Sequence, residues 1–325
     1  MRAAQYDRLG PAADVLSIVD LDDPEPGPGE VRVEVSFSGI NPTDWKRRTA
    51  GPLAPGPAQI PNQDGAGIID AVGAGVSPQR LGERVWVFHA AWNRPGGTAA
   101  GYVCVPAAQA VALPEGVSLE LGASLGIPYI TAHAALTYDG DIAGATVLVT
   151  GGGGAVGHAA IELGAFLGAD VIASASTPEK AQVARAAGAR AVLDYRSPHY
   201  LTDLRATAPM GVDRIIEVAL GANIAASQAV LRPGAVIVAY ASEATDPVLP
   251  ARALMTLNAQ VRFLLVYTLP QDRIQAATAD ISQALGQGLI TSLPTVVYPL
   301  EQIALAHAAV ETGTFGRVLV DVQSS

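Results

Sequence analysis

Glycines cluster near the middle of the chain at a spacing that can hold phosphate groups. The segment 147–157 has the sequence VLVTGGGGAVG, and its glycines fit the pattern G-x-G-x-x-G. The residues before them are apolar, as in a buried strand, and those after them have the pattern of a helix. Glycine permits a tight turn there and lets a pyrophosphate approach the amides at the helix start, where the helix dipole favours negative charge. This context predicts a dinucleotide site, rather than a glycine-rich turn of another parallel sheet, with contacts at Gly152, Gly153, Gly154, Ala155, Val156 and Gly157.

The end of the next expected strand bears on which dinucleotide binds. A site for NAD carries an acidic residue about 20 residues after the glycines, where it binds the ribose hydroxyls. Here the strand 170–176 ends with Ser174 and Ser176, whose hydroxyls can donate to a phosphate. Lys180 follows in the first turn of the next helix, and Tyr195 follows the third strand. This pattern favours a phosphorylated ribose; a solvated helix lysine and a locally packed tyrosine are the alternatives.

The elements around these residues alternate between strand and helix from about residue 130. Six apolar segments are expected as strands, namely 146–150, 170–176, 190–195, 212–218, 235–240 and 259–267. The segment 178–188 between two of them is expected as a helix, with Thr177 as its N-cap and Pro178 in its first turn. Six strands joined by crossover helices predict an α/β protein with a doubly wound parallel sheet, the Rossmann arrangement.

The two ends of the chain have a different character. Up to about residue 125, short strand candidates alternate with Gly- and Pro-rich turns. After Pro270 a helical segment, a strand, a second helix and a last strand follow, and they do not continue the Rossmann order. We therefore expect a β-rich domain formed by residues 1–125 and 269–325, and a dinucleotide-binding domain formed by residues 126–268.

Composition narrows the classes of function. The chain has 325 residues, a net charge of −10 and a single cysteine, Cys104. The acidic balance argues against a nucleic-acid surface, and no uninterrupted apolar segment is long enough for a membrane span. The first ten residues, MRAAQYDRLG, lack the apolar core of a signal peptide. A lone cysteine excludes an internal disulfide and fits a reducing cytoplasm.

Motifs along the whole chain resemble one family. They are GINPTDWKRR (39–48), IPNQDGAGIIDAVGAGV (60–76), LGERVW (81–86), GTAAGYVCVP (97–106), IPYITAHAAL (127–136) and the segment 298–320. In this order they resemble the medium-chain dehydrogenase/reductase superfamily, and within it the zinc-free quinone oxidoreductases related to zeta-crystallin. The resemblance implies a GroES-like catalytic domain beside the Rossmann domain, NADPH as cofactor, and a homodimer.

The resemblance also bears on zinc. The zinc alcohol dehydrogenases would carry a cysteine at Asn41 and a histidine at Gln63, and four further cysteines for a structural site. The five histidines of this chain are scattered, without the spacing of a ligand set. We therefore expect no metal site. Without a Lewis acid, the expected reaction is reduction of a conjugated acceptor such as a quinone or an enone.

The same resemblance assigns further site residues. A lysine and a tyrosine matching Lys180 and Tyr195 hold the 2′-phosphate of NADPH in the family. Three residues, Asn41, Lys46 and Thr131, are expected near the nicotinamide and its ribose or phosphate. The remaining cofactor candidates are Tyr240, Ser242, Tyr267 and Arg317. Asn41 and Tyr129 are the candidates for contact with the reacting groups, although plain packing explains Tyr129 equally well.

The resulting expectation is an NADPH-dependent, zinc-free reductase of quinones or related α,β-unsaturated carbonyls. The alternatives are an enoyl or enone reductase of the same superfamily and a crystallin-like protein that binds NADPH without turnover. The segment 259–267 should form the edge of the Rossmann sheet, and its uncharged run Phe263–Val266 suggests pairing with a second copy. An edge covered by the chain's own C-terminal helix is the alternative.

Overall fold

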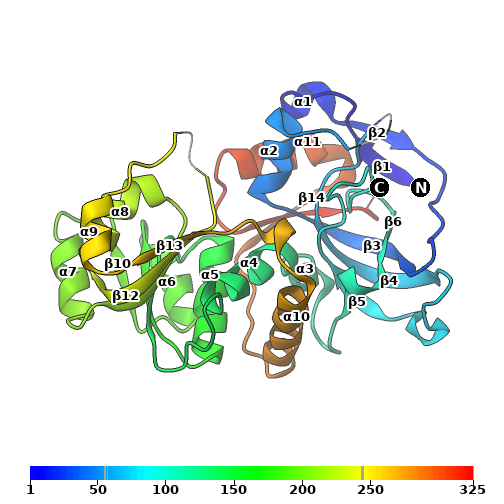
Figure 1. The fold of residues 1–325 in the computed structure, drawn as a ribbon. Coiled ribbons are helices and arrows are strands. Elements are labelled where there is room, and N and C mark those ends of the chain that lie inside the picture. The colour runs from blue at the N-terminus through cyan, green and yellow to red at the C-terminus, as the bar shows by residue number, and fades with distance from the viewer. Residues whose placement is uncertain (55, 57, 243–244, 325) are drawn as a thin grey trace. The chain divides into compact units, whose positions relative to one another are not determined.

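The computed structural model describes residues 1–54, 56, 58–242 and 245–324. Its chain divides into two compact units. The first unit contains residues 1–127 and 292–325, and the second contains residues 128–291. Figure 1 shows the helices and strands of both units with their labels.

The second unit is built on a parallel sheet with the predicted strands. In the described residues this sheet has six strands in the order β10-β9-β8-β11-β12-β13. Their bounds are Thr146–Val149 (β8), Asp170–Ala175 (β9), Ala191–Asp194 (β10), Val212–Glu217 (β11), Leu231–Ala239 (β12) and Gln260–Phe263 (β13). This order, third-second-first-fourth-fifth-sixth, is that of a Rossmann fold and confirms the predicted doubly wound sheet.

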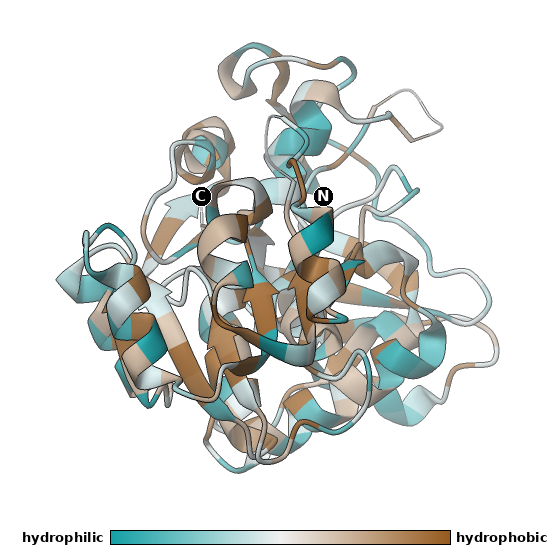
Figure 2. Ribbon diagram, turned by 60° about the vertical axis from the view of Figure 1, so that its left-hand side comes forward, coloured by the Kyte–Doolittle hydropathy of each residue, from teal (hydrophilic) through white to brown (hydrophobic). Residues whose placement is uncertain are grey.

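Helices connect these strands and cover the sheet. Their bounds in the second unit are Gly126–Leu136 (α4, whose first two residues belong to the first unit), Ala155–Phe166 (α5), Pro178–Ala186 (α6), Tyr200–Thr207 (α7), Leu220–Gln228 (α8), Ala251–Thr256 (α9) and Gln271–Gly286 (α10). A short 3-10 turn, Val266–Thr268, precedes α10. The strands are the more hydrophobic elements because their side chains are buried under helices on both faces, as the brown strands of Figure 2 indicate.

The long helix α10 lies in a different unit from the one expected. We expected residues 269–291 in the β-rich domain, but they group with the second unit. Asp280 accepts a hydrogen bond of 2.7 Å from His133 of α4, and the Arg273 guanidinium donates to the carbonyls of Thr137 and Tyr138. These bonds attach α10 to the end of α4, and only the chain from residue 292 onward returns to the first unit.

The first unit is β-rich, as expected. Its strands are Arg2–Gln5 (β1), Ser17–Asp20 (β2), Glu30–Ile40 (β3), Asp64–Val72 (β4), Arg84–Val87 (β5), Tyr102–Pro106 (β6), Ala110–Ala112 (β7), Thr295–Pro299 (β14) and Arg317–Asp321 (β15). Its helices are Ala12–Val15 (α1), Pro42–Ala50 (α2), Leu119–Gly122 (α3) and Ile303–Glu311 (α11), with short 3-10 turns at Pro78–Arg80, Ala107–Gln109 and Leu300–Gln302. The last strand, β15, pairs antiparallel with β3, so the C-terminal segment completes the sheet.

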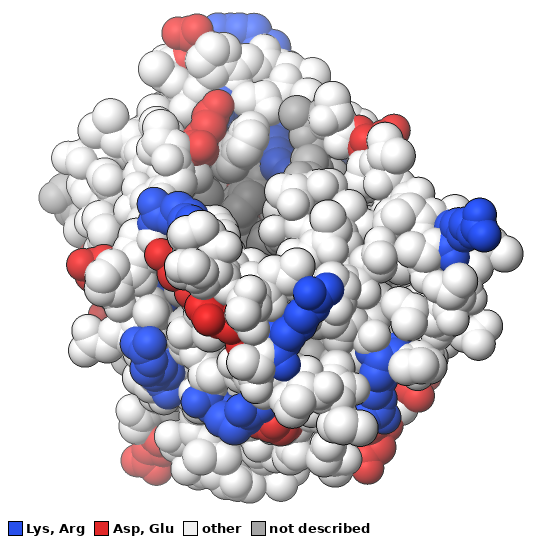
Figure 3. Space-filling model, turned by 90° about the vertical axis from the view of Figure 1, so that its left-hand side faces the viewer, with Lys and Arg blue, Asp and Glu red and all other residues white. Residues whose placement is uncertain are grey.

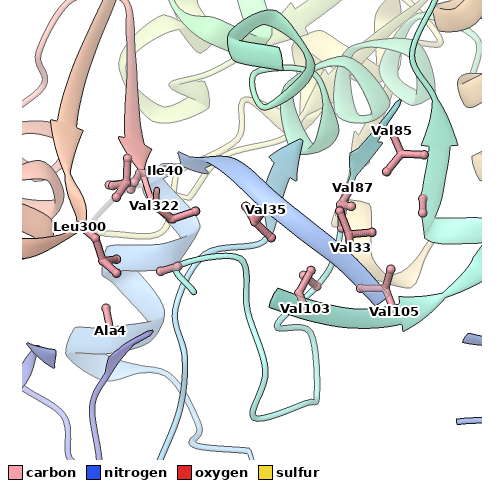
Figure 4. Packing of buried hydrophobic residues seen from close by; sticks show 14 of the residues in the cluster. Ala4, Val33, Val35, Ile40, Val85, Val87, Val103, Val105, Leu300 and Val322 are labelled. Atoms are coloured by element: carbon pink, nitrogen blue, oxygen red, sulfur yellow. The ribbon is translucent and has the colours of Figure 1, made fainter. Parts of the chain in front are cut away.

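A valine-rich core holds the first unit together. Valines of three strands point toward one another in the close view of Figure 4, namely Val33, Val35, Val85, Val87, Val103 and Val105. Their positions alternate along each strand, so one face of the curved sheet is apolar throughout. The long strand β3 contributes to both ends of this core because it pairs with β4, β6 and β15.

Strand β13 lies at the edge of the Rossmann sheet, as predicted. It is shorter than the expected segment and ends at Phe263. Phe263 and Leu265 are 67% and 53% exposed, whereas Leu264 is 8% exposed and donates its amide to Ala239. The exposed apolar side chains of this edge are therefore Phe263 and Leu265, rather than the whole run.

Two surface properties agree with the composition. On the face shown in Figure 3, acidic and basic side chains are interspersed, and neither sign covers a continuous area of the described residues. Within the described part of the chain, every helix is too short or too polar to cross a membrane.

Candidate functional site

The glycine loop connects β8 to α5 in the second unit. Gly151 has a φ of +68°, a conformation that side chains disfavour. A Cβ on Gly157 would lie 2.3 Å from the Gly151 carbonyl oxygen, and one on Gly153 would lie 2.6 Å from the Lys180 Cβ. Glycine is therefore required at these positions by the close approach of backbone and neighbouring side chain. The loop predicted from sequence is formed as expected.

The start of α5 is suited to an anion. Gly154 is the N-cap and provides no side chain to occupy the helix end, and the first turn contains no acidic residue. A Cβ on Gly154 would have one neighbour within 4 Å, the Gly151 oxygen at 3.4 Å, so its surroundings are comparatively open. Ala155 and Val156, in the first turn, are half-buried. Backbone amides at such an uncapped end can bind phosphate oxygens.

Ser174 supports this loop instead of standing at its surface. The Gly151 amide donates to the Ser174 hydroxyl at 3.3 Å, and the Gly152 amide donates to the Ser174 carbonyl at 2.8 Å. The side chain is buried, and Tyr200 also hydrogen-bonds to it. We expected the Ser174 hydroxyl to face a phosphate. It is buried instead, and it holds the glycine loop on β9 by its hydrogen bonds.

The other three residues expected at the ribose end are accessible. Ser176 and Lys180 are half-buried, and Tyr195 is 47% exposed. Strands β9 and β10 are paired, and the Tyr195 amide donates to the Ala175 carbonyl at 3.4 Å, so the two strand ends meet at one edge. Thr177 caps α6 by accepting from the Lys180 amide, as predicted. This edge therefore combines hydroxyl groups with a lysine.

The carboxylate nearest in sequence to Ser176 and Lys180 belongs to the helix end. Glu179 lies in the first turn of α6 and is exposed. Hydrogen bonds from its own backbone amide and from Thr177 lower the pKa of its carboxyl group. Glu179 is thus engaged as a stabilising charge at a helix N-terminus, as its position in the sequence indicated.

A buried glutamate that sequence reasoning missed lies at the end of β11. Glu217 accepts hydrogen bonds from the Thr150 hydroxyl (2.9 Å), the Ala219 amide (2.7 Å) and the Asn223 amide group (2.7 Å). The Ser227 hydroxyl adds a fourth at 3.3 Å. The carboxylate thus fixes the carboxyl ends of β8 and β11 where a Rossmann fold binds its ligand. An acidic residue ending an apolar strand was the available signal.

The remaining cofactor candidates of the second unit differ in how deeply they are buried. Tyr240 is half-buried after β12; burial, and then the charge of Glu217, raise the pKa of its hydroxyl above the ordinary value. Ser242 is exposed, and Tyr267 is half-buried in the turn before α10. Thr131 is buried within α4.

Tyr129 belongs to a buried cluster in the second unit. Its hydroxyl donates to Glu162 of α5 at 2.6 Å, and the other oxygen of Glu162 accepts from the Thr291 amide and hydroxyl. His158 lies 3.1 Å from the same carboxylate. All these side chains except that of Thr291 are almost fully buried. This arrangement favours the packing interpretation of Tyr129 over contact with a substrate.

Asn41 is the centre of a polar cluster in the first unit. Its side-chain Nδ2 donates to Asp64 at 2.6 Å, and Arg317 donates to its Oδ1 at 3.1 Å. The carboxylate of Asp44 accepts from the Asn41 backbone amide at 2.7 Å, so Asn41 also begins α2. Asp64 accepts from the Ile127 amide as well. The structure therefore brings together the predicted Asn41 and Arg317 with two aspartates.

Lys46 lies apart from this buried cluster. It is exposed on α2, with its Nζ 5.9 Å from the centre of the Trp45 ring. Gln63 is buried, and its side-chain oxygen accepts from the Ala91 amide at 3.1 Å.

A chain of hydrogen bonds connects His307 of the C-terminal helix α11 with Asp64. The Thr98 hydroxyl donates to the Asp64 carbonyl at 2.6 Å, so Ser38 must donate to Thr98 (2.8 Å). Asn62 donates its Nδ2 to Ser38, and its Oδ1 lies 3.0 Å from Nε2 of His307. His307 is therefore the Nε2–H tautomer. Burial lowers the pKa of His307 to about 3, which keeps the ring neutral.

Two segments of the chain match known domains in sequence. Residues 27–115 match the alcohol dehydrogenase GroES-like domain, and residues 155–283 match the domain described as zinc-binding dehydrogenase. The quinone oxidoreductase of Sus scrofa is 29% identical over 309 residues, which cover 93% of this chain and 92% of that protein.

Solved structures extend the agreement to the fold. Crystal structures of the quinone oxidoreductase from Thermus thermophilus, which include a complex with NADPH, match with a TM-score of 0.82 and 28% identity over 99% of this chain and 100% of that one. An NAD-dependent alcohol dehydrogenase matches with a TM-score of 0.87 and 26% identity, over 99% of this chain and 100% of that one.

The fold and the two matched domains define a medium-chain dehydrogenase/reductase. Strand order, glycine loop and β-rich unit are each those expected from the sequence motifs. Within this superfamily the chain is similar to the quinone oxidoreductases.

Proposed function

We propose that the protein is an NADPH-dependent oxidoreductase that reduces quinones or related α,β-unsaturated carbonyls. The observation that carries the cofactor assignment is the edge formed by β9 and β10, where Ser176, Lys180 and Tyr195 are accessible and Glu179 is engaged at its own helix end. The relatives named quinone oxidoreductase, and the NADPH complex of the one from Thermus thermophilus, support the same conclusion.

The glycine loop fits the pyrophosphate of such a cofactor. Gly153 and Gly157 leave no space for a Cβ, whereas Gly154 opens the start of α5 to a ligand. In this proposal the amides of Ala155 and Val156 bind phosphate, and Lys180 and Tyr195 bind the 2′-phosphate. Tyr240, Ser242 and Tyr267 contact the cofactor beyond the carboxyl ends of the strands. Asn41, Lys46, Thr131 and Arg317 are proposed near its nicotinamide end.

The chemistry needs one hydride and one proton. When bound, NADPH supplies the hydride from nicotinamide C4. Reduction of a quinone adds this hydride and one proton to give a hydroquinone, whereas an enone receives the hydride at one carbon and the proton at the next. The residues of the chain orient the reactants and exclude water from the reacting atoms.

We propose that this reaction proceeds without zinc. The two positions at which the zinc-dependent relatives place ligands carry the amides of Asn41 and Gln63, and both amides are engaged in hydrogen bonds. Within the described ranges, no group of three His, Cys, Asp or Glu side chains could hold a metal ion. Purified protein should contain no stoichiometric zinc, and a chelator should leave its activity unchanged; zinc recovered at one per chain, with activity lost on its removal, would contradict this.

The experiment that tests the function is NADPH oxidation with a panel of acceptors. A set of quinones, enones and enoyl thioesters is supplied with NADPH or NADH, and the products are identified. Hydroquinone formation at the higher kcat/KM supports the proposal, and a saturated carbonyl as the main product supports the enone reductase. Tight NADPH binding without turnover of any acceptor would identify a crystallin-like binding protein. If NADH is used as well as NADPH, the cofactor preference would instead be like that of the NAD-dependent alcohol dehydrogenase.

We also propose a homodimer paired through β13. The edge position of this strand and the exposed Phe263 and Leu265 support this proposal, because an open apolar edge otherwise promotes aggregation. Light scattering should give twice the chain mass, and Leu265→Lys should shift it toward monomer. Exposed Met210, remote in sequence from this edge, provides the control Met210→Lys, which should stay dimeric. A native monomer at micromolar concentration would refute the proposal.

A further inference from the structure

The buried centre of the first unit has more acidic than basic groups. Asp44 and Asp64 are 4% and 0% exposed, and both lie within the electrostatic influence of Arg317, which is 5% exposed. If both aspartates were ionised, the two carboxylates and the one guanidinium would leave a net negative charge that is buried away from water. Such a charge is costly in a buried site, and protonation of one carboxyl group removes it.

The two aspartates reach Asn41 from different sides. Asp64 accepts from the side-chain Nδ2 at 2.6 Å, and Asp44 accepts from the backbone amide at 2.7 Å. Arg317 donates to the remaining polar atom of the side chain, Oδ1, at 3.1 Å. The amide group of Asn41 is therefore held in one orientation by an acceptor on one side and a donor on the other.

The surroundings distinguish the two carboxyl groups. The charge of Arg317 is the largest influence that lowers the pKa of Asp64, whereas for Asp44 it is weaker than the hydrogen bond from Asn41. Asp64 lies close to Gly126, because a Cβ on Gly126 would be 2.1 Å from the Asp64 Oδ1. The amide of the next residue, Ile127, donates to both carboxylate oxygens of Asp64. Asp64 is thus the better site for the negative charge.

Other charged and titratable groups lie farther along the same elements. Arg48 of α2 is paired with Glu311 of α11 at 3.0 Å. Tyr6, which follows β1, is influenced by Asp44, Arg47 and Arg48. The charge of Arg48 helps to keep His307 neutral. Arg317 is therefore the cation whose charge bears directly on both aspartates.

We propose that Asp44 and Asp64 together retain one proton, held on Asp44, and that ionised Asp64 is the positioning residue that orients the Asn41 amide for the reaction. Asp44 acts as the switch of this pair. When Asp44 also ionises, two carboxylates compete for Arg317, and the bond from Arg317 to Oδ1 of Asn41 weakens. The role of Asn41 at the reacting end rests on the proposed function.

Electrostatics supports the order of ionisation. Burial raises the pKa of Asp44 to about 8, helped by the charge of Asp64 and opposed by the hydrogen bond from Asn41, the charge of Arg317 and the hydrogen bond from Gln63. Burial raises the pKa of Asp64 to about 7, against the opposing effects of Arg317 and the hydrogen bonds from Ile127 and Asn41. Asp64 therefore ionises first as the pH rises, and the pair titrates as a unit.

Infrared spectroscopy of protein labelled with 13C-aspartate tests the proton directly, without substrate or cofactor. The unmutated protein should show the carbonyl band of a protonated, buried aspartic acid at neutral pH, and the band should disappear as the pH rises through about 8. Asp44→Asn should remove the band, and the control Asp70→Asn, on the same strand as Asp64 and paired with Arg32, should keep it. Absence of the band from the unmutated protein, or its persistence in Asp44→Asn, overturns the proposal.

Kinetics tests the positioning role. The kcat of the unmutated enzyme should fall as the pH rises above about 8, and Asp44→Asn, a neutral analogue of the protonated acid, should lose this decline. Asp64→Asn should lower kcat about tenfold or more at every pH, the equivalent of one charge-assisted hydrogen bond. A flat profile in the unmutated enzyme, or an unchanged kcat in Asp64→Asn, contradicts the positioning role. If no acceptor is reduced at all, the proposed function fails, while the infrared result still decides the proton.

Discussion

The two units hold their site residues in opposite ways. In the second unit the predicted phosphate contacts are backbone amides of a loop, fixed by glycines that approach other backbone atoms closely. In the first unit Asn41 and Arg317 are buried side chains fixed by hydrogen bonds and charge. Substitutions should therefore act by shape in the glycine loop and by electrostatics at buried polar or charged side chains, in whichever unit these lie.

The largest effect is expected in the glycine loop. Gly157→Ala places a Cβ 2.3 Å from the Gly151 oxygen, so the loop must shift. We expect NADPH affinity to fall by about two orders of magnitude and the unfolding free energy by about 1–3 kcal/mol, as for overpacking. Fluorescence titration and urea unfolding measure the two quantities. Gly286→Ala is the control, because a Cβ there has nothing within 4 Å; equal affinities in both variants would contradict the steric argument.

A buried carboxylate of the second unit provides the electrostatic counterpart. Glu217→Leu leaves the donors of Ala219, Asn223 and Ser227 without this acceptor, whereas the Thr150 hydroxyl retains the Ile216 carbonyl at 3.1 Å. We expect the unfolding free energy to fall by about 3 kcal/mol or more, since unsatisfied buried donors cost roughly 1–3 kcal/mol each. Urea unfolding measures it. Glu217→Gln retains one acceptor oxygen and should cost less; the reverse order would show that shape, and not hydrogen bonding, dominates there.

The imidazole of His307 should make stability depend on pH. Its pKa is lowered from 6.5 to about 3 by burial and then by the charge of Arg48, so the unfolded chain binds the proton first as the pH falls. The stabilisation is present above about pH 6.5 and is lost on acidification toward about pH 3, at up to about 1.4 kcal/mol per pH unit. His307→Gln should flatten this slope in urea unfolding at several pH values, whereas the exposed His199→Gln should not. An unchanged slope in His307→Gln would be evidence against a neutral native histidine.

The smallest effect is expected at the ribose end, where surface side chains act. Lys180→Met keeps the stem that packs on Gly153 and removes the charge. The preference for NADPH over NADH should fall by about tenfold, as expected for one charge-assisted hydrogen bond of about 1.5–3 kcal/mol. Dissociation constants for both cofactors measure it. Arg185→Met, in the last turn of the same helix, should leave the preference unchanged; a preference retained in Lys180→Met would reassign the phosphate contact.

The sequence predicted those features that arise from local pattern. Apolar segments with crossover helices define the order of the Rossmann strands, and glycine spacing defines the loop. The exposure of individual side chains was not predictable, because it depends on partners distant in sequence. Ser174 is turned under the loop, and Leu264 faces inward while Leu265 is exposed.

Long-range partners also explain what was missed. Helix α10 was expected in the β-rich domain because its sequence does not continue the strand order, yet Asp280 and Arg273 attach it to α4. The chain from His307 to Asp64 joins residues 243 positions apart through intermediates that have no motif of their own. Such networks arise from tertiary packing, which a single sequence does not display.

The pairing of β15 with β3 has a consequence for the order in which the protein is made. The first unit begins ahead of the second in the chain, but its sheet lacks β14 and β15, and Asn41 lacks Arg317, until residues 295–321 leave the ribosome. The second unit is a continuous segment and can complete its fold while the first still waits for its C-terminal strands. During synthesis, the domain that is begun first is therefore the one that is finished last.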